Sequence, residues 1–101
     1  MKLVLVTAVE EFQKDVLEIF NKANIENFSS SDIDGYKNVP SLLMASNWFS
    51  AGKSRNESIM FFSFTTKEKI DGLFSIIEEF NNNLETNNPI KAIVIPVEKF
   101  I

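Results

Sequence analysis

The sequence predicts an α+β domain whose elements follow the order β-α-β-β-α-β. Three observations carry this prediction: short apolar runs of strand length, two longer stripes of apolar residues at helical spacing, and turn-forming residues between them. The 101 residues are enough for one domain with a single core, and ten phenylalanines supply much of its apolar material. We therefore expect residues 1–101 to form one domain.

The first half is expected to form a strand, a helix and a second strand. The continuously apolar run 3–9 predicts a strand covered on both faces. Residues 10–24 predict a helix, because their apolar side chains share one face: Phe12, Val16, Ile19, Phe20 and Ala23. Residues 28–34 are rich in Ser and Asp and predict a weaker, partly exposed strand that ends at Gly35.

A long loop separates the two halves. From Val39 to Asn56 no periodicity persists, and Pro40, Gly52 and four serines interrupt the chain. Loops of this length are usually functional. The next run, "SIMFFSFT" at residues 58–65, is the clearest strand of the sequence because it is dense in aromatic and apolar side chains.

The last two elements are a helix and a strand. Residues 67–84 predict a helix, with Thr65 and Glu68 at the spacing of a capping box and an apolar stripe formed by Ile70, Leu73, Phe74, Ile77, Phe80 and Leu84. "IKAIVIPV", residues 90–97, predicts the final strand. Pro96 lacks an N–H group, so we expect it near the end of that strand or on a sheet edge.

This order of elements is typical of ferredoxin-like folds, in which a four-stranded antiparallel sheet packs two helices on one face. The first and third strands are then central, and both are rich in apolar residues here. The other face would expose either Phe61 or its alternates Met60, Phe62 and Phe64. Such a patch usually marks an interface, so we expect an oligomer of ring-like symmetry that closes over this face.

Composition excludes several classes of function. The chain has no histidine and no cysteine, which excludes disulfides, Cys nucleophiles, Ser-His-Asp triads and thiolate or imidazole metal sites. The net charge of −4 opposes nucleic-acid binding. No apolar run approaches a membrane span, and the apolar run at the start is short for a signal peptide. We expect a cytoplasmic protein without membrane insertion.

The stretch "NWFSAGKSRNES", residues 47–58, is the candidate partner-binding site. It combines an aromatic pair, Trp48 and Phe49, with the cations Lys53 and Arg55. Aromatic residues and arginine are enriched among interface anchors. The alternative is that Trp48 packs under its own loop or into a neighbouring subunit. A phosphate-binding P-loop is not expected, because that pattern needs a glycine where Asn47 stands.

Carboxylates are the remaining candidates for a chemical site. Glu10-Glu11 and Glu78-Glu79 offer oxygen ligands for Ca²⁺ or Mg²⁺, but neighbouring acids on a helix point in different directions, and a solvated face explains them better. Asp32 and Asp34 share one face of the second strand. They are candidates for acid–base work, or they protect a sheet edge from aggregation.

Two stretches resemble the PII-like superfamily of signalling proteins, which includes the PII nitrogen regulators and the CutA-like proteins. "EEFQKDVLEIFNKANIENFSSSDIDGYK", residues 10–37, resembles the opening helix and a strand that ends in a Gly-aromatic pair, here Gly35-Tyr36. "IKAIVIPVEKFI", residues 90–101, resembles the closing strand followed by its Val-Glu pair. The resemblance implies a homotrimer of β-α-β-β-α-β subunits with a long loop between the second and third strands.

The resemblance also implies a function. Members of the superfamily bind nucleotides in clefts between subunits, and the positions that match here are Ser29, Gly35, Tyr36 and Lys37. The chain would then be a regulatory protein, not an enzyme. It would bind a partner, such as a transporter or an enzyme, through the 39–56 loop, under the control of a small ligand.

The chain departs from the superfamily at the phosphate site. "NNLETNNP", residues 82–89, stands where nucleotide-binding PII proteins carry glycine and basic residues, and their C-terminal arginines have no match. We therefore expect no certain cofactor, with a nucleotide as one candidate ligand. Two alternatives stay open: a CutA-like trimer associated with metal or stress, and a small enzyme that uses Asp32, Asp34 or Tyr36 as acid or base.

Overall fold

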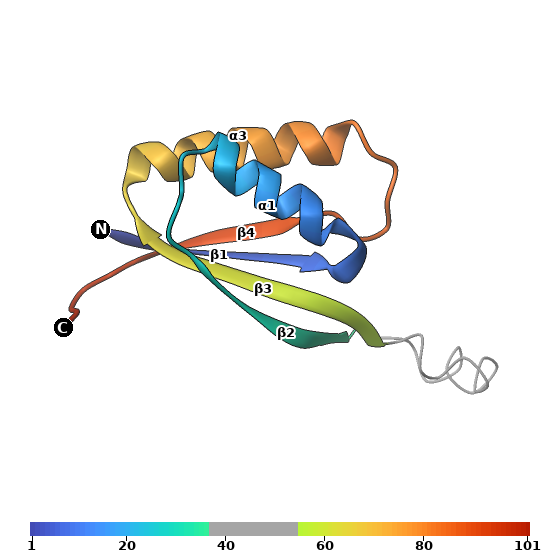
Figure 1. The fold of residues 1–101 in the computed structure, drawn as a ribbon, viewed down its shortest axis with the longest axis horizontal. Helices are drawn as coiled ribbons and strands as arrows, with labels where there is room; N and C mark the ends of the chain where they lie inside the picture. The colour runs from blue at the N-terminus through green and yellow to red at the C-terminus, as the bar shows by residue number, and fades with distance from the viewer. Residues whose placement is uncertain (37–54) are drawn as a thin grey trace.

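The computed structural model describes residues 1–36 and 55–101. In these parts one antiparallel sheet has the order β2-β3-β1-β4 and is built from β1 (Lys2–Val9), β2 (Ser29–Tyr36), β3 (Arg55–Thr65) and β4 (Lys91–Pro96). Two helices, α1 (Gln13–Lys22) and α3 (Lys67–Asn82), lie on the same side of the sheet (Figure 1). The α+β class, the four-stranded antiparallel sheet and the two helices are confirmed.

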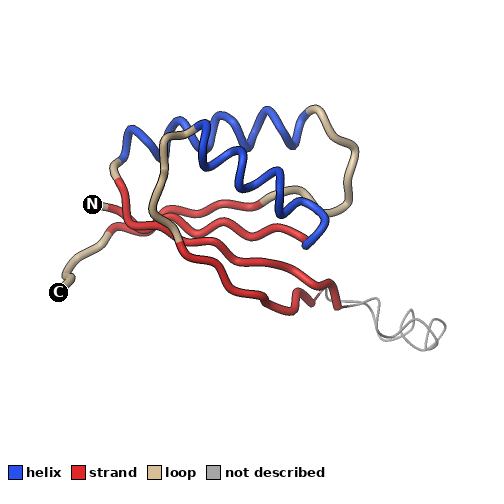
Figure 2. The backbone as a smooth tube through the Cα atoms, viewed as in Figure 1, coloured by secondary structure: helices blue, strands red, loops and turns tan. Residues whose placement is uncertain are grey.

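The sheet and the helices form two layers, which the backbone tube shows most plainly (Figure 2). The central strands are β1 and β3, and the edge strands are β2 and β4. Pro96 is the last residue of edge strand β4, where its missing N–H group costs no sheet hydrogen bond.

β3 begins three residues earlier than the sequence indicates. Arg55 and Asn56, expected in the loop, pair with Tyr36 and Gly35 of β2. The sequence prediction of a loop over these two residues was therefore wrong. The reason is that β2 continues to Tyr36, so the backbones of Arg55 and Asn56 find hydrogen-bonding partners in β2. The sequence around residues 55 and 56 carries no sign of these distant partners.

The capping box expected at the start of α3 does not form. Thr65 pairs with Lys2 as the last residue of β3, so its backbone belongs to the sheet. The N-cap is Thr66, and its side chain makes no capping hydrogen bond. The helix also stops at Asn82, before the Leu84 that was expected to end its stripe. The spacing of residues in the sequence therefore predicted both ends of α3 wrongly. Thr65 belongs to the sheet, and Leu84 belongs to the loop that follows the helix.

The core lies between the sheet and the helices. Alternate residues of the central strands are buried there, and the apolar stripes of α1 and α3 cover them. Phe61 is 1% exposed, and its ring lies 5.8 Å from that of Phe20 and 6.2 Å from that of Phe28. Since strand side chains alternate, Met60, Phe62 and Phe64 must point to the other side of the sheet.

The helix-free side of the sheet carries a continuous apolar surface. Leu5 pairs with Phe62 on one side and with Ile93 on the other, and the next row along the sheet joins Leu3 to Phe64 and Ile95. Paired residues in an antiparallel sheet share a face. We call this surface the open face and define it by Leu3, Leu5, Met60, Phe62, Phe64, Ile93 and Ile95. Phe64 and Ile93 are each 54% exposed.

The link from α1 to β2 begins with a tight turn. Asn24 has φ 61°, a left-handed conformation that Asn tolerates better than most residues. Its N–H donates to the carbonyl of Asn21 at 3.1 Å, and the N–H of Ile25 donates to the carbonyl of Phe20 at 3.0 Å. This Schellman pattern ends the helix and turns Ile25 into the core.

Candidate functional site

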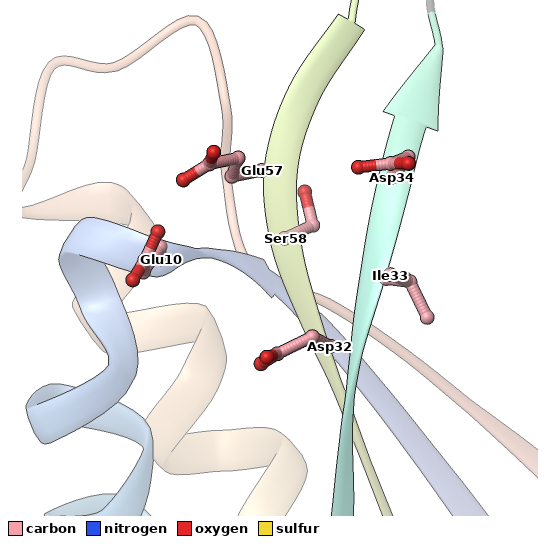
Figure 3. A pocket seen from close by; sticks show the side chains of 6 residues that line it. All are labelled: Glu10, Asp32, Ile33, Asp34, Glu57 and Ser58. Atoms are coloured by element: carbon pink, nitrogen blue, oxygen red, sulfur yellow. The ribbon is translucent and has the colours of Figure 1, made fainter.

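Four carboxylates gather at the end of the sheet where β2 ends and β3 begins (Figure 3). Glu10 opens a short 3-10 helix, η1 (Glu10–Phe12), directly after β1, and Asp32 and Asp34 come from β2. Glu57 comes from β3 and pairs with Asp34. With Ile33 and Ser58 these four residues line a recess, which we call the acidic recess.

Three of these carboxylates point into one space. Figure 3 shows Glu10, Asp32 and Glu57 directed toward one another, while Ile33 points to the other side of β2. The sheet register explains this arrangement, because Asp32 pairs with Ile59, whose side chain is buried under the helices. Asp32, Asp34 and Glu57 therefore all project from the helix side of the sheet. The turn after β1 brings Glu10 to the same side.

Glu10 holds its proton more tightly in the acidic recess than in water, because its carboxyl group lies beside that of Glu57. A hydrogen bond to Glu57 raises the pKa of Glu10 above its ordinary value of 4.5, and repulsion from the Glu57 charge raises it further. Desolvation and the charge of Asp32 act in the same direction with smaller effects. In the protonated form Glu10 donates and the Glu57 carboxylate accepts. Because these side chains are exposed, we expect added salt to weaken the repulsion.

The acidic recess has the residue types for proton transfer or for hard cations. Asp32 and Asp34, singled out from the sequence, do converge there, together with Glu10 and Glu57. Within residues 1–36 and 55–101, no group of three or more Asp, Glu, His or Cys side chains has the arrangement of a metal site. The neighbouring carboxylates favour proton uptake by Glu10, because they raise its pKa.

Replacing Glu57 with glutamine should stabilise the protein at neutral pH and flatten its response to acid. The folded chain binds a proton at Glu10 more tightly than the unfolded chain does, so the free energy of unfolding rises as the pH falls through the raised pKa toward 4.5. Glu57→Gln removes the main cause of this uptake. We expect a higher Tm than wild type near neutral pH and nearly equal Tm values at about pH 4, measured by circular dichroism.

Glu11→Gln is the matched control for this experiment, because Glu11 is an exposed carboxylate one residue from Glu10. It removes the same net charge without removing the Glu10 partner. If the two variants gain equal stability at neutral pH, the effect comes from net charge, and the account of the Glu10–Glu57 pair is wrong.

A second recess lies at the same end of the sheet and brings Gly35 together with the segment before β4. We call it the glycine recess; its lining comprises Thr7, Ala8, Val9, Ile33, Gly35, Ser58, Asn87, Asn88, Pro89 and Lys91. Hydroxyls and side-chain amides dominate its polar groups, and Lys91 is the cation among these residues. A small anion or a polar heterocycle fits this chemistry.

The segment that borders the glycine recess is held in place by Asn81 of α3. Its side-chain amide donates to the carbonyl of Ile90 at 2.8 Å, and its side-chain oxygen accepts from the N–H of Ile90 at 2.9 Å. The N–H of Asn88 donates to the Thr86 hydroxyl at 3.0 Å. These bonds fix both ends of the loop between α3 and β4, and with it one wall of the recess.

The structure separates residues that the family resemblance groups in one ligand site. Ser29 begins β2 and Gly35 lies near its end, so the two are about 20 Å apart along the strand. Gly35 lines the glycine recess, whereas Ser29 pairs with Phe62. The backbone of Tyr36 pairs with that of Arg55. Lys37, Trp48, Phe49 and Lys53 lie outside the described residues.

Sequence reasoning missed Glu57 and Lys91 as site residues. Glu57 directly precedes the strand expected from residue 58, and Lys91 lies in the last strand, whose neighbour is unknown until the sheet order is given. The pairing of Thr7 with Lys91 brings the cation to the recess. The one local signal was the break in the apolar pattern of the last strand at Lys91.

Comparisons with known proteins leave the family unassigned. No helix in the described parts of the chain is long and apolar enough to span a membrane. No protein-family model matches the sequence, and no curated protein matches it.

Proposed function

We propose that this chain is a PII-like regulatory protein with a ferredoxin-like fold, and that three copies assemble by closing their open faces against one another. It acts in the cytoplasm by binding a partner protein, such as a transporter or an enzyme, through the 39–56 loop. It has no catalytic activity of its own. A small ligand in the glycine recess controls the binding of the partner.

The order of the strands supports the fold assignment. In a ferredoxin-like sheet the third strand inserts between the first and the second, and the fourth lies on the far side of the first. The order β2-β3-β1-β4 has this pattern. A fold of this kind hosts many functions, so the strand order supports the architecture only. The function has to be argued from the surfaces of the protein.

The open face is the observation that carries the proposal. Its seven apolar side chains span three strands, and Phe62 and Phe64 add an edge-to-face aromatic contact with ring centroids 6.5 Å apart. A contiguous apolar surface of this kind favours association in water. Identical subunits that meet through it in a closed ring would cover every copy of the surface at once.

Two further features support regulation by a ligand. The glycine recess places Gly35 beside Lys91 and the Asn-rich segment 87–88, next to the end of β2 from which the proposed partner-binding loop departs. A ligand there would contact both the sheet and the segment held by Asn81. Arg55, at the start of β3, is the described member of the partner-binding group.

Titrating the fluorescence of the single tryptophan, Trp48, tests this function. We expect a saturable change with an adenine nucleotide. The change should be larger with AMP or cyclic AMP than with ATP, because Lys91 is the one cation among the described residues that line the recess and can balance the charge of one phosphate but not of three. ATP, ADP, AMP and cyclic AMP should each be tested with and without Mg²⁺.

Lys91→Gln is the control variant for this titration. It keeps a side chain of similar length and removes the charge, so it should lose the response while keeping the mass of the wild-type oligomer. No response from a wild-type trimer to any of these nucleotides would contradict nucleotide control. A response that survives in Lys91→Gln would place the ligand elsewhere.

A further inference from the structure

Residues 97–101, which follow β4, carry an exposed aromatic side chain away from the body of the protein. We call these residues the arm. Figures 1 and 2 show the arm leaving the sheet on the side away from the helices. Phe100 is 74% exposed, and Glu98 and Lys99 are also exposed. An exposed phenylalanine between charged residues and an isoleucine has the composition of an interface segment.

A recess at the same end of the sheet has the complementary chemistry. β1 pairs with β3 as far as Thr65, but β2 begins at Ser29 opposite Phe62, so the end of β3 extends past β2. The recess beside this overhang has Ile25 and Phe64 as its larger apolar residues besides Met1, and Glu26 and Lys69 as its charged ones. We call it the overhang recess.

The charges of the arm and of the overhang recess match in pairs. The arm offers an acid, a base and an aromatic ring in the order Glu98, Lys99, Phe100. The recess offers a base and an acid, Lys69 and Glu26, beside its apolar residues. Lys67, the other cation of the first turn of α3, already pairs with Asp71 at 2.8 Å. Lys69 is therefore the better partner for an incoming acid.

We propose that the arm of one subunit binds the overhang recess of the neighbouring subunit. Phe100 packs against Phe64, which is 54% exposed, Glu98 pairs with Lys69, and Lys99 pairs with Glu26. The arm follows edge strand β4, whereas the overhang recess opens beside β3 toward the opposite edge, β2. A contact that joins opposite edges of identical subunits is head-to-tail, and such contacts form a ring when the rotation between neighbours closes on itself.

This proposal rests on the proposed oligomer and adds to it. Phe64 belongs both to the open face and to the overhang recess, so the arm would continue the surface that the subunits bury. The arm would thereby determine which neighbour each subunit accepts. The open face supplies non-directional apolar contact, and the two charge pairs fix the direction of the ring.

A disulfide cross-link tests the contact directly, because the chain has no cysteine of its own. Lys69→Cys combined with Glu98→Cys should give covalent dimers and trimers on a denaturing gel after mild oxidation, and reductant should reverse them. Lys67→Cys with Glu98→Cys is the matched control, since Lys67 is an exposed lysine two residues away on the same helix. Each single-cysteine variant should stay monomeric on the gel at the same protein concentration.

The outcomes separate this proposal from the one on which it rests. Covalent oligomers from the first pair alone support it. A cross-linked monomer would mean that the arm folds onto its own subunit, and an intact oligomer without cross-links would mean that the arm binds elsewhere. Either result overturns the proposal and leaves the trimer standing. A monomeric mass for the unmodified wild-type protein would overturn the trimer and the arm contact together.

A second measurement uses Phe100. Phe100→Ser should raise the protein concentration at which half of the oligomer dissociates by roughly tenfold or more, because it removes a buried aromatic side chain. It should leave the fold of the subunit unchanged, as measured by circular dichroism. An unchanged dissociation curve would overturn the role given to Phe100.

Discussion

Replacing Phe61 with alanine should lower the free energy of unfolding by about 3–5 kcal/mol, the usual cost of removing a buried aromatic ring. Phe61 is on the helix side of central strand β3, and its ring lies against those of Phe20 and Phe28. The helices and the sheet are joined at this cluster, so the cavity cannot close without moving α1. Urea denaturation followed by circular dichroism measures the loss.

Leu17→Ala is the control for this substitution. Leu17 is on α1 but 41% exposed, so its truncation should change the free energy of unfolding by less than about 1 kcal/mol. A loss for Phe61→Ala as small as that of the control would contradict the assignment of Phe61 to the core. It would also mean that the two faces of β3 are assigned the wrong way round, and the definition of the open face would then be wrong as well.

Replacing Ile93 with glutamate should abolish self-association. Ile93 is exposed in the subunit and pairs with Leu5 at the centre of the open face, so the assembly would have to bury an unpaired carboxylate there. That cost is several kcal/mol. We expect the dissociation constant to rise by roughly a hundredfold or more. Sedimentation velocity at matched concentrations measures the change.

Leu17→Glu tests whether this effect depends on position. It adds the same charge at another exposed apolar residue, on α1 and therefore on the opposite side of the molecule from the open face. It should keep the mass of the wild-type protein. If Ile93→Glu also keeps that mass, or if both variants dissociate, the open face is not the assembly surface.

Periodicity predicted the elements of this fold but not the faces of β3. The run Ile59 to Phe64 is apolar in both parities except at Ser63, so alternation alone gave no reason to prefer Phe61 or Phe62 as the buried residue. Pairing decides it, because Phe61 lies opposite Val6, which is fully buried. The buried alternate, Ser63, is the polar one. Its hydroxyl donates to the carbonyl of Asn27 at 2.6 Å, which satisfies it inside the core.

The candidate sites were predictable only in part. Strand spacing placed Asp32 and Asp34 on one face, and they do line the acidic recess. Glu10 and Glu57 join them through the turn after β1 and the β2–β3 register, which are long-range features. The family resemblance grouped Ser29 with Gly35, but the length of β2 separates them. Residues that a family resemblance assigns to one site can lie at opposite ends of the same strand, so the positions of the strands must be known before the residues are treated as one site.

The mass of the unmodified protein in solution tests the central claim most directly. Sedimentation equilibrium across a range of micromolar concentrations should give a species of three times the 11.5 kDa chain mass, because the open face has no cover within the described subunit. A stable mass of 11.5 kDa at every concentration would contradict the account, since the open face would then remain in water.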